Sequence, residues 1–493
     1  MMNCKRAQIS HIPETNISIH SAKSFGTKPC GIRRFSNAET VHIVAQGSVM
    51  HMKWLMALNE GLWQWLLPVL LPLTAILCGV ASRMHPLRYF GTLLRHTYGT
   101  LLQPQGKSHA LTQRQIFATA LAATMGTGNL VGTAVAISLG GAGALFWLWI
   151  SAPMGMLLVY AENLLGTHCR DASTKGTLAY LQNGVRSPML AAVFAICCIG
   201  ASIGMGNLAQ SNAMASALEG IGIPLPVTGT VTAVLLLWIL MGGSKRIGRL
   251  TEWLMPLLCG GYLLCCLWLI LQRIEVLPGV FVQILQEAFG VRAMGSGLSI
   301  SAMLFCMSIG LRRGIFSNEA GLGSSALLHG EGEHTSPTAQ GEWAAAEVFA
   351  DTTLCCTVTG LALLTAPAGT VAYGSQDGAG MLLRAFRAGF GDIAVWLLAI
   401  CIALLAFATL IGWYGCGRMA FCYVFGEKHC GVYLAIYVTA AFCGALGKAA
   451  FVWLLCDVCN GCMALPNLYG LWRLLPTLRQ ITDTCKMQQN VVK

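Results

Sequence analysis

The sequence has little charge. Only 10% of its 493 residues are Asp, Glu, Lys or Arg, whereas soluble domains carry about 25%. This scarcity excludes a water-soluble globular protein. The net charge of +11 could suggest a nucleic-acid partner, but Lys and Arg lie in short connections between apolar runs, not on one stripe or tail. We therefore expect a lipid bilayer as the main partner and no nucleic acid.

Motifs for nucleotide binding and catalysis are also missing. The sequence has no P-loop and no H-E-x-x-H motif, and the glycines from Gly126 to Gly132 miss the dinucleotide fingerprint by one residue, with no strand before them. No convergent nucleophile or His cluster indicates a membrane enzyme, and no repeated pore loop indicates a channel. We expect no enzyme activity, no resident cofactor and no required ATPase subunit.

The 21 cysteines lie singly or as neighbours within apolar runs. We interpret them as small buried apolar residues and not as a disulfide framework. Cys456, Cys459 and Cys462 have the C-x-x-C-x-x-C spacing of a metal or iron–sulfur site, but no fourth ligand follows at motif spacing. An ordinary packing role is therefore the favoured interpretation of these three residues.

The chain divides into three parts by composition. Residues 1–52 are polar, Ser-rich and basic, and they lack the apolar core of a signal peptide. We interpret them as a mis-assigned start in preference to a flexible tail. Residues 53–478 are expected to form a single transmembrane domain, and residues 479–493 a cytoplasmic tail.

Apolar runs of membrane-spanning length recur after residue 52. Because the bilayer core offers no water, backbone groups there must pair within the segment, so about 20 apolar residues predict a helix. Alternating ten-residue strands of a β-barrel are absent. The sequence thus predicts an all-α polytopic membrane protein. Its eleven expected spans are 62–82, 116–138, 143–165, 189–218, 225–241, 251–271, 298–326, 343–366, 391–416, 432–447 and 449–474.

The distribution of Lys and Arg predicts the orientation. Connections after the odd-numbered spans, together with the C-terminal tail, hold most of these residues. The positive-inside rule places this set in the cytoplasm, the N-terminus outside and the C-terminus inside. Two segments disagree: the acidic stretch 329–334 and the basic prefix, which would have to cross the membrane.

Two of the apolar runs are interrupted by residues that destabilise a membrane helix. The first contains Gly126-Thr127-Gly128-Asn129, and the second contains Ser317-Asn318-Glu319-Ala320-Gly321 after Arg312 and Arg313. A helix-interior glycine costs about 1 kcal/mol, and unsatisfied backbone in lipid costs more. Close helix packing through small residues is the alternative for the first segment. Two discontinuous helices about 190 residues apart are typical of an inverted-repeat transporter.

Broken helices of this kind can bind a small zwitterion. The exposed N–H groups attract a carboxylate, while freed carbonyl oxygens can hold Na⁺ or an ammonium group. Glu319 could pair with Arg313 or contribute to ion coupling. Glu162, Glu347 and Asp351 could gate or carry protons, but pairing with Lys or Arg of a neighbouring helix is slightly favoured.

Five strings carry a resemblance to a known family. They are ALAATMGTGNLVGTAVAISLGGAGALFWLWISAPMGMLLVYAE, GMGNLAQSNAMASAL, GGSKRIGRLTEWLMP, RRGIFSNEAGLGSSA and NGCMALPNL. In this order they resemble the alanine or glycine:cation symporter family from about residue 60 to 475. The resemblance implies a bacterial inner-membrane importer of alanine or glycine coupled to Na⁺. It also implies a peripheral first helix followed by a leucine-transporter-type five-plus-five inverted repeat.

The same resemblance implies a set of substrate-binding residues contributed by four spans. They are Thr127, Gly128, Asn129, Gln210, Phe316, Ser317, Asn318, Thr409 and Trp413. Thr409 and nearby backbone carbonyls are candidate Na⁺ ligands, and Glu319 and Asp351 are further candidates for ion coupling. Residues Tyr414 to Met419 depart from the family pattern, and Trp413 could instead be an interfacial belt residue.

The resulting hypothesis is a secondary symporter in which Na⁺ and a small neutral amino acid bind together at mid-membrane. The alternative is a proton-coupled permease that uses Glu319, Glu162 or Asp351 as the carrier. The pattern does not distinguish L-alanine, D-alanine and glycine, since the pocket volume depends on side-chain packing.

Overall fold

Apolar stretches fold into helices wherever the chain is described. The computed structural model describes residues 53–101, 111–290, 299–332, 336–447 and 450–491, and every regular element in these ranges is a helix. The helices from Lys53 onward belong to one unit, Met52–Lys493. The all-α polytopic class is thus confirmed. The prefix 1–52 lies outside the described residues, and the boundaries at residues 52 and 479 stay predictions.

Eight helices in the described part of the chain are long and apolar enough to cross a membrane. They are Lys53–Ala81, which contains η1 (Gly61–Leu66) and α2 (Leu67–Ala81); α7 (Gly143–His168); Pro188–Glu219, which contains α9 (Pro188–Ile203), η4 (Gly204–Leu208) and α10 (Ala209–Glu219); α12 (Gly243–Leu271); Ile300–Asn318 within α14 (Ser299–Asn318); Pro337–Thr365, which contains α16 (Pro337–Val348), η7 (Phe349–Cys355) and α17 (Cys356–Thr365); α19 (Ile393–Phe425); and Glu427–Leu446, which contains α20 (Cys430–Leu446).

A bent pair of helices supplies a ninth candidate span. It joins α5 (Gln113–Thr124) to the segment Gly128–Gly140, which contains η2 (Gly128–Gly132) and α6 (Thr133–Gly140), with a bend of 49°. The two other expected spans are also helical, as α11 (Leu225–Leu240) and α21 (Ala450–Arg473). All eleven expected segments are therefore helices, although α11 is shorter than a typical span.

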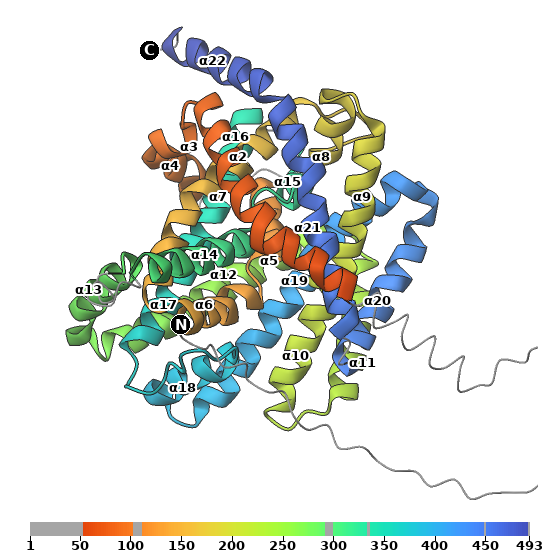
Figure 1. Cartoon of the computed structure of the whole chain (residues 1–493). Helices are drawn as coiled ribbons and strands as arrows, with labels where there is room; N and C mark the ends of the chain where they lie inside the picture. The colour runs from red at the N-terminus through yellow and green to blue at the C-terminus, as the bar shows by residue number, and fades with distance from the viewer. Residues whose placement is uncertain (1–52, 102–110, 291–298, 333–335, 448–449, 492–493) are drawn as a thin grey trace, which may run out of the picture. The chain divides into compact units, whose positions relative to one another are not determined.

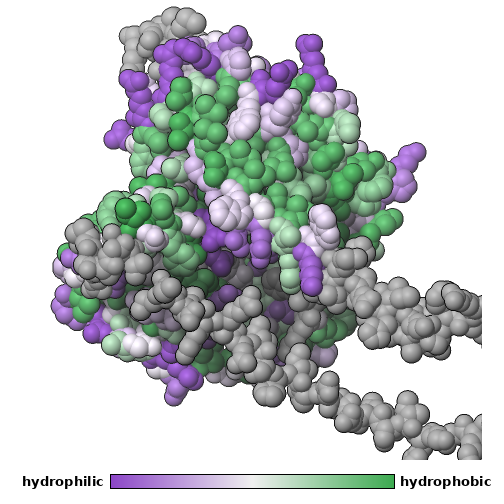
Figure 2. Space-filling view, in the orientation of Figure 1, coloured by the Kyte–Doolittle hydropathy of each residue, from purple (hydrophilic) through white to green (hydrophobic). Residues whose placement is uncertain are grey.

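The surface shown in Figure 2 has the distribution of polarity expected for a bilayer protein. Apolar side chains cover much of its upper and middle part, and hydrophilic side chains gather at its top. On the helix Lys53–Ala81, for example, the side chains of Trp65, Val69, Ile76 and Val80 are exposed. Because water penalises such a cluster whereas acyl chains do not, lipid is its natural environment.

Two helices form the centre of the bundle. α7 packs against α14 and α16, and α19 packs against α5, α9 and α10. The connecting helices lie towards two ends: α4 and α22 at the top of Figure 1, and α18 at the bottom. This separation agrees with the expected alternation of connections. The shorter elements are α3 (His85–Arg88), α4 (Phe90–Leu101), α8 (Gly176–Ala179), η3 (Tyr180–Gly184), η5 (Ile274–Val276), α13 (Leu277–Ala288), α15 (Ser324–His329), α18 (Gly378–Phe390), η8 (Glu427–His429) and α22 (Leu475–Val491).

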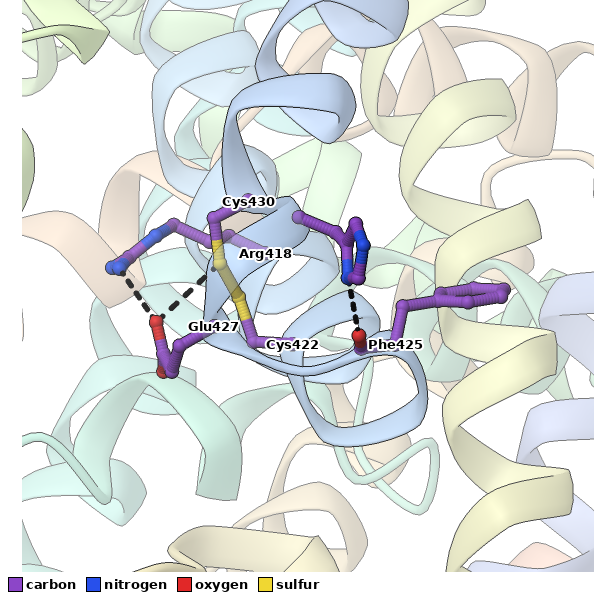
Figure 3. Close-up of a disulfide and its surroundings, with 6 residues drawn as sticks. Arg418, Cys422, Phe425, Glu427 and Cys430 are labelled. Atoms are coloured by element: carbon purple, nitrogen blue, oxygen red, sulfur yellow. Dashed lines mark hydrogen bonds and ion pairs between the residues drawn. A yellow bond between two sulfur atoms is a disulfide. The ribbon is translucent and has the colours of Figure 1, made fainter.

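The expectation that the cysteines form no disulfide is wrong at one position. Cys422, near the end of α19, is bonded to Cys430, the first residue of α20, with their Cα atoms 6.0 Å apart. Figure 3 shows this disulfide beside Glu427, whose carboxylate lies 3.4 Å from both Arg418 and the Cys430 sulfur. A tight turn between two helices brings the cysteines together, a proximity that apolar patterning does not reveal.

Thiol labelling tests this disulfide. We expect maleimide to modify Cys422 and Cys430 only after reduction, because a disulfide sulfur is not nucleophilic. The exposed free thiol of Cys443 should be labelled in both conditions and serves as the internal control. Peptide mass spectrometry identifies the labelled cysteines. Equal labelling of Cys422 and Cys430 before and after reduction would contradict the pairing.

Candidate substrate and ion site

The first helix interruption is confirmed. α5 begins with a capping box in which Thr112 and Gln115 exchange hydrogen bonds, and its last helical residue is Thr124. The chain then turns at Met125 and Gly126 before η2 begins. A Cβ atom on Gly126 would lie 2.7 Å from the Thr409 hydroxyl, so α5 and α19 can approach this closely only with glycine at that position.

The second interruption separates α14 from α15. Three residues here have left-handed backbone conformations: Glu319 (φ +52°), Gly321 (φ +84°) and Gly323 (φ +82°). The Gly321 carbonyl accepts a hydrogen bond from Asn467 at 2.8 Å, and the Gly323 carbonyl accepts one from Thr177 at 2.6 Å. Side chains of neighbouring helices therefore satisfy backbone groups that the broken helix leaves free, as the bilayer requires.

A cavity of about 590 Å³ lies between the two interruptions. Its wall includes seven of the nine predicted substrate-binding residues, together with Glu319. These residues are Thr127, Gly128, Asn129, Gln210, Phe316, Ser317, Thr409 and Glu319. Asn318 and Trp413 are not among the residues that line the cavity, and neither is Asp351. Segments far apart in the chain thus converge on one space.

Gln210 reaches the first interruption from α10. The Thr127 hydroxyl donates to the Gln210 side-chain oxygen at 3.1 Å, and the Gln210 amide nitrogen donates to the Met205 carbonyl at 3.4 Å. Thr409 lies against the same turn, with its hydroxyl bonded to the Leu405 carbonyl at 3.1 Å. These polar groups surround backbone that is not in regular α-helix, which is the arrangement that can bind both ends of a zwitterion.

Asp351 is a fully buried carboxylate beside the cavity wall. Asn129 donates to one of its oxygens through Nδ2, and the other oxygen accepts from Thr352 at 3.0 Å and from Ser317 at 3.5 Å. Among the described residues all of its hydrogen-bond partners are neutral. The Asn129 side-chain oxygen is buried without a partner. Because a buried charge without a counter-charge is costly, this carboxylate requires a proton or a bound cation.

Trp413 is buried and not at a membrane interface, so the belt interpretation is wrong. Its indole N–H donates to Glu319 at 3.0 Å, and the other oxygen of Glu319 accepts from Ser324 at 2.9 Å. One hypothesis was that Glu319 pairs with Arg313, and these contacts show that it does not. Trp413 approaches the cavity through Glu319 and not directly.

Asn318 points away from the cavity. Its side-chain oxygen accepts from the Ala320 amide at 3.1 Å, and its nitrogen lies where a Cβ on Gly155 of α7 would be only 2.6 Å away. Its role in substrate binding stays a prediction. The close approach of α7 and α14 at this point depends on Gly155 having no side chain.

The favoured pairing of Glu162, Glu347 and Asp351 with Lys or Arg is wrong. Glu162 accepts from the Asn467 amide at 2.6 Å, and Glu347 lies 2.8 Å from the His329 ring. The hydrophobic pattern could not show this, since Asn467 and His329 come from other parts of the chain.

A hydrogen-bonded network extends from Thr124, which lines the cavity, to His329 of α15. His329 lies between Glu347 and Gln340, and Gln340 in turn accepts from Gln113 at 2.7 Å. Thr124, the last residue of α5, donates to the second oxygen of Glu347 at 3.0 Å. The network joins α5, α15 and α16. The hydrophobic pattern gave no sign of this network, although His329 lies in the acidic stretch 329–334 and Gln340 lies six residues beyond it.

Cys456 packs against η4, and Cys459 packs against α9. Cβ atoms on Gly204 and Gly200 would lie 1.8 Å and 2.7 Å from their sulfurs. Within the described residues, the three side chains that lie close enough to hold a metal are Cys422, Glu427 and Cys430, at the disulfide turn. The packing interpretation of the C-x-x-C-x-x-C cysteines agrees with this geometry.

Comparison with known proteins assigns the chain to a group of transporters. The profile of the Sodium:alanine symporter family matches residues 48–492. The chain is 35% identical over 370 residues to the Sodium/alanine symporter AgcS of Methanococcus maripaludis, covering 72% of this chain and 80% of that protein. It is 32% identical over 376 residues to the Probable sodium/glutamine symporter GlnT of Bacillus subtilis, covering 74% and 77%.

A similar solved structure is MhsT in complex with L-phenylalanine, with a TM-score of 0.48 and 14% identity. The alignment covers 77% of this chain and 99% of that one. The five-plus-five arrangement of the repeats stays a prediction.

Proposed function

Because the chain belongs to the sodium:alanine symporter family, and is therefore a transporter and not an enzyme, we propose that it imports alanine or glycine together with Na⁺. The observation that carries this proposal is the fully buried Asp351, whose partners in the described part of the chain are neutral and which adjoins a cavity between two broken helices. The gradient supplies the energy, so no ATPase subunit is needed.

The substrate binds with its α-carboxylate at the unwound backbone of the two interruptions. Free N–H groups at the starts of helical segments favour a negative charge there. Thr127, Gln210 and Ser317 add hydroxyl and carboxamide groups around the same space. Gly126 and Gly128 let the backbone come close to a small ligand, because no Cβ intervenes.

Na⁺ binds at the Asp351 carboxylate. Na⁺ prefers hard oxygen ligands, and Asp351 and the Ser317 hydroxyl supply them 3.5 Å apart, while the side-chain oxygen of Asn129 is buried and unpartnered next to them in the chain of hydrogen bonds. Binding there neutralises the buried carboxylate and orders the start of η2. A second candidate position lies at the Thr409 hydroxyl, next to Gly126.

Access to the site follows the cavity wall. The wall extends to Ala379, Gly380 and Leu383 of α18, whereas the side towards α15 holds Glu319 and the His329 network. With the orientation that the Lys and Arg distribution predicts, α18 faces the outside of the inner membrane. The described conformation is then the outward-facing one, and rocking of the repeats exposes the site to the cytoplasm.

Proton coupling is the second candidate. Asp351 and Glu319 are buried with neutral partners among the described residues, and Glu162 is bonded to Asn467, so a proton could replace Na⁺ as the neutralising species. Each carboxylate would then have to release its proton on the cytoplasmic side.

Uptake by the purified protein in liposomes distinguishes Na⁺ coupling from proton coupling. We expect labelled alanine to accumulate when an inward Na⁺ gradient is imposed at equal pH on both sides, and to stop when K⁺ replaces Na⁺. A proton gradient alone should not drive accumulation. Uptake that ignores Na⁺ and follows the proton gradient would refute the Na⁺ proposal, and protein-free liposomes provide the background.

A further inference from the structure

The turn between α19 and α20 brings two sulfur atoms and one carboxylate to the same point. Cys422 lies in the last turn of α19, Glu427 in η8 and Cys430 at the start of α20. Gly426 ends α19 with φ +84°, a conformation that glycine tolerates, so the chain reverses direction within a few residues. The three potential ligand atoms all lie within 4.8 Å of one another. None of these residues lines the cavity, so the cluster is separate from the substrate site.

The distances within this cluster suit one tetrahedral metal ion. Zn–S bonds of ~2.3 Å and a Zn–O bond of ~2.0 Å place a sulfur and an oxygen about 3.5 Å apart on a tetrahedron. The Glu427 carboxylate lies 3.4 Å from the Cys430 sulfur. Two sulfurs on the same ion lie about 3.8 Å apart, so the disulfide has to be broken first. The Cα atoms of the two cysteines are 6.0 Å apart, and rotation of their side chains is enough to supply that separation.

The surroundings favour the ionised forms that a metal requires. Figure 3 shows Glu427 beside both the disulfide and Arg418, whose guanidinium lies 3.4 Å from the carboxylate. Cys430 is the first residue of α20, where the helix dipole stabilises a thiolate. Metal ions bind cysteine as the thiolate, so this position favours binding. The side chain of Glu427 is 79% exposed, and an ion can therefore enter from solvent.

The side of the membrane decides the oxidation state of the two sulfurs. With the orientation that the Lys and Arg distribution predicts, the connection from α19 to α20 lies in the cytoplasm. Cytoplasmic thiol systems keep most cysteines reduced, and clustered cysteines there more often bind metals or react than form permanent disulfides. Two cysteines close enough to be oxidised, with a carboxylate beside them, match a metal site in the reduced state.

We propose that Cys422, Cys430 and Glu427 bind Zn²⁺ when the disulfide is reduced. Two thiols of a cytoplasmic reductant supply two electrons and two protons: the S–S bond breaks, two cysteine thiols form, and the reductant becomes a disulfide. Zn²⁺ then displaces the two thiol protons to solvent, binds both thiolates and the Glu427 carboxylate, and keeps a water molecule as its fourth ligand. Thiolates select such a cation over Na⁺, so the site is chemically distinct from the coupling-ion position at Asp351.

Zn²⁺ titration of the purified full-length protein in detergent tests the site. The protein is reduced with a phosphine, freed of reductant without oxygen, and titrated with Zn²⁺ against a chromophoric chelator. We expect one Zn²⁺ per chain, and binding weaker by about 100-fold or more after the same sample is reoxidised, because the thiolates are lost. Co²⁺ should bind in the same place and give a sulfur-to-cobalt charge-transfer band. Reoxidation leaves the chain intact, so misfolding cannot explain the loss.

Single substitutions identify the ligands. Cys422→Ser and Cys430→Ser should each weaken Zn²⁺ binding by about 100-fold or more, because a hydroxyl is a poor Zn²⁺ ligand. Glu427→Gln should weaken it by about tenfold or more, since even the loss of an outer-shell partner costs that much. The controls are Cys443→Ser, which removes an exposed free thiol of α20, and Cys459→Ser in the C-x-x-C-x-x-C run. Both should bind Zn²⁺ as the wild type does.

Three results would overturn the proposal. The reduced wild type binds no Zn²⁺, the oxidised protein binds it equally well, or Cys459→Ser removes the binding whereas Cys422→Ser does not. Unchanged affinity in Glu427→Gln would show that the carboxylate is not a ligand and that the three-ligand site is wrong. Because Zn²⁺ binding is measured without transport, none of these results bears on the proposed uptake of alanine or glycine.

Discussion

Asp351→Asn is expected to lower the apparent affinity for Na⁺ on the order of 100-fold and to reduce uptake at physiological Na⁺ accordingly. The substitution preserves the size of the side chain and one oxygen but removes the negative charge. A charge–charge contact at an effective dielectric of about 20 contributes a few kcal/mol, and 100-fold corresponds to about 2.7 kcal/mol. The measurement is alanine uptake as a function of external Na⁺ in liposomes.

Asn129→Ala should also lower the apparent affinity for Na⁺, but by less than Asp351→Asn does. It removes both the donor to Asp351 and the unpartnered oxygen that is available to the ion. The control is Asp392→Asn, an exposed carboxylate at the start of α19 that does not itself line the cavity. If Asp351→Asn retains the Na⁺ dependence of the wild type, the ion does not bind at this carboxylate, and Thr409 becomes the leading position.

Trp413→Phe is expected to reduce uptake by about 10- to 100-fold without lowering membrane abundance. Phenylalanine keeps most of the buried ring but lacks the N–H that donates to Glu319. Loss of a hydrogen bond to a buried charged group costs about 1.5–3 kcal/mol. Because Glu319 terminates α14 in a left-handed conformation and lines the cavity, disorder of its side chain should propagate to the second interruption.

A double-mutant cycle separates this contact from general packing. Glu319→Gln removes the charge that Trp413 stabilises, so Trp413→Phe should cost less in that background than in the wild type. The matched control is Trp396→Phe on the same helix, where the ring is 54% exposed. Two results would contradict the prediction: Trp413→Phe and Trp396→Phe change uptake equally, and the effects of Glu319→Gln and Trp413→Phe on uptake are additive. The hydrogen bond between Trp413 and Glu319 would then not support the site.

Several parts of the site could be predicted from sequence because they depend on composition along one segment. The interruptions at Gly126 and Glu319 were predictable, since glycine, Asn and charged residues within an apolar run oppose a continuous membrane helix. Gln210 was predictable as a buried amide that needs a partner. The role of each residue in binding stays a prediction, whereas its position at the cavity is observed for Gln210 and Thr409.

Other parts of the site required the packed structure. Asn318 was expected at the substrate but faces Gly155 of α7, because one residue along a helix rotates the side chain by about 100°. The same rotation puts Ser317 on the cavity wall. Glu347 pairs with His329 and not with a Lys or Arg, and Arg313 faces Asp457 across more than 140 intervening residues.

The sequence by itself determined that this chain crosses a bilayer as α-helices and that two of these helices are interrupted. Both conclusions rest on free energies of single segments, namely the transfer of apolar residues to lipid and the cost of unpaired backbone there. Only the tertiary structure decided which polar groups meet: Asn129 with Asp351, Trp413 with Glu319, and Cys422 with Cys430. Helix rotation and the pairing of distant helices decide those contacts, and neither is encoded in the hydropathy of any one span.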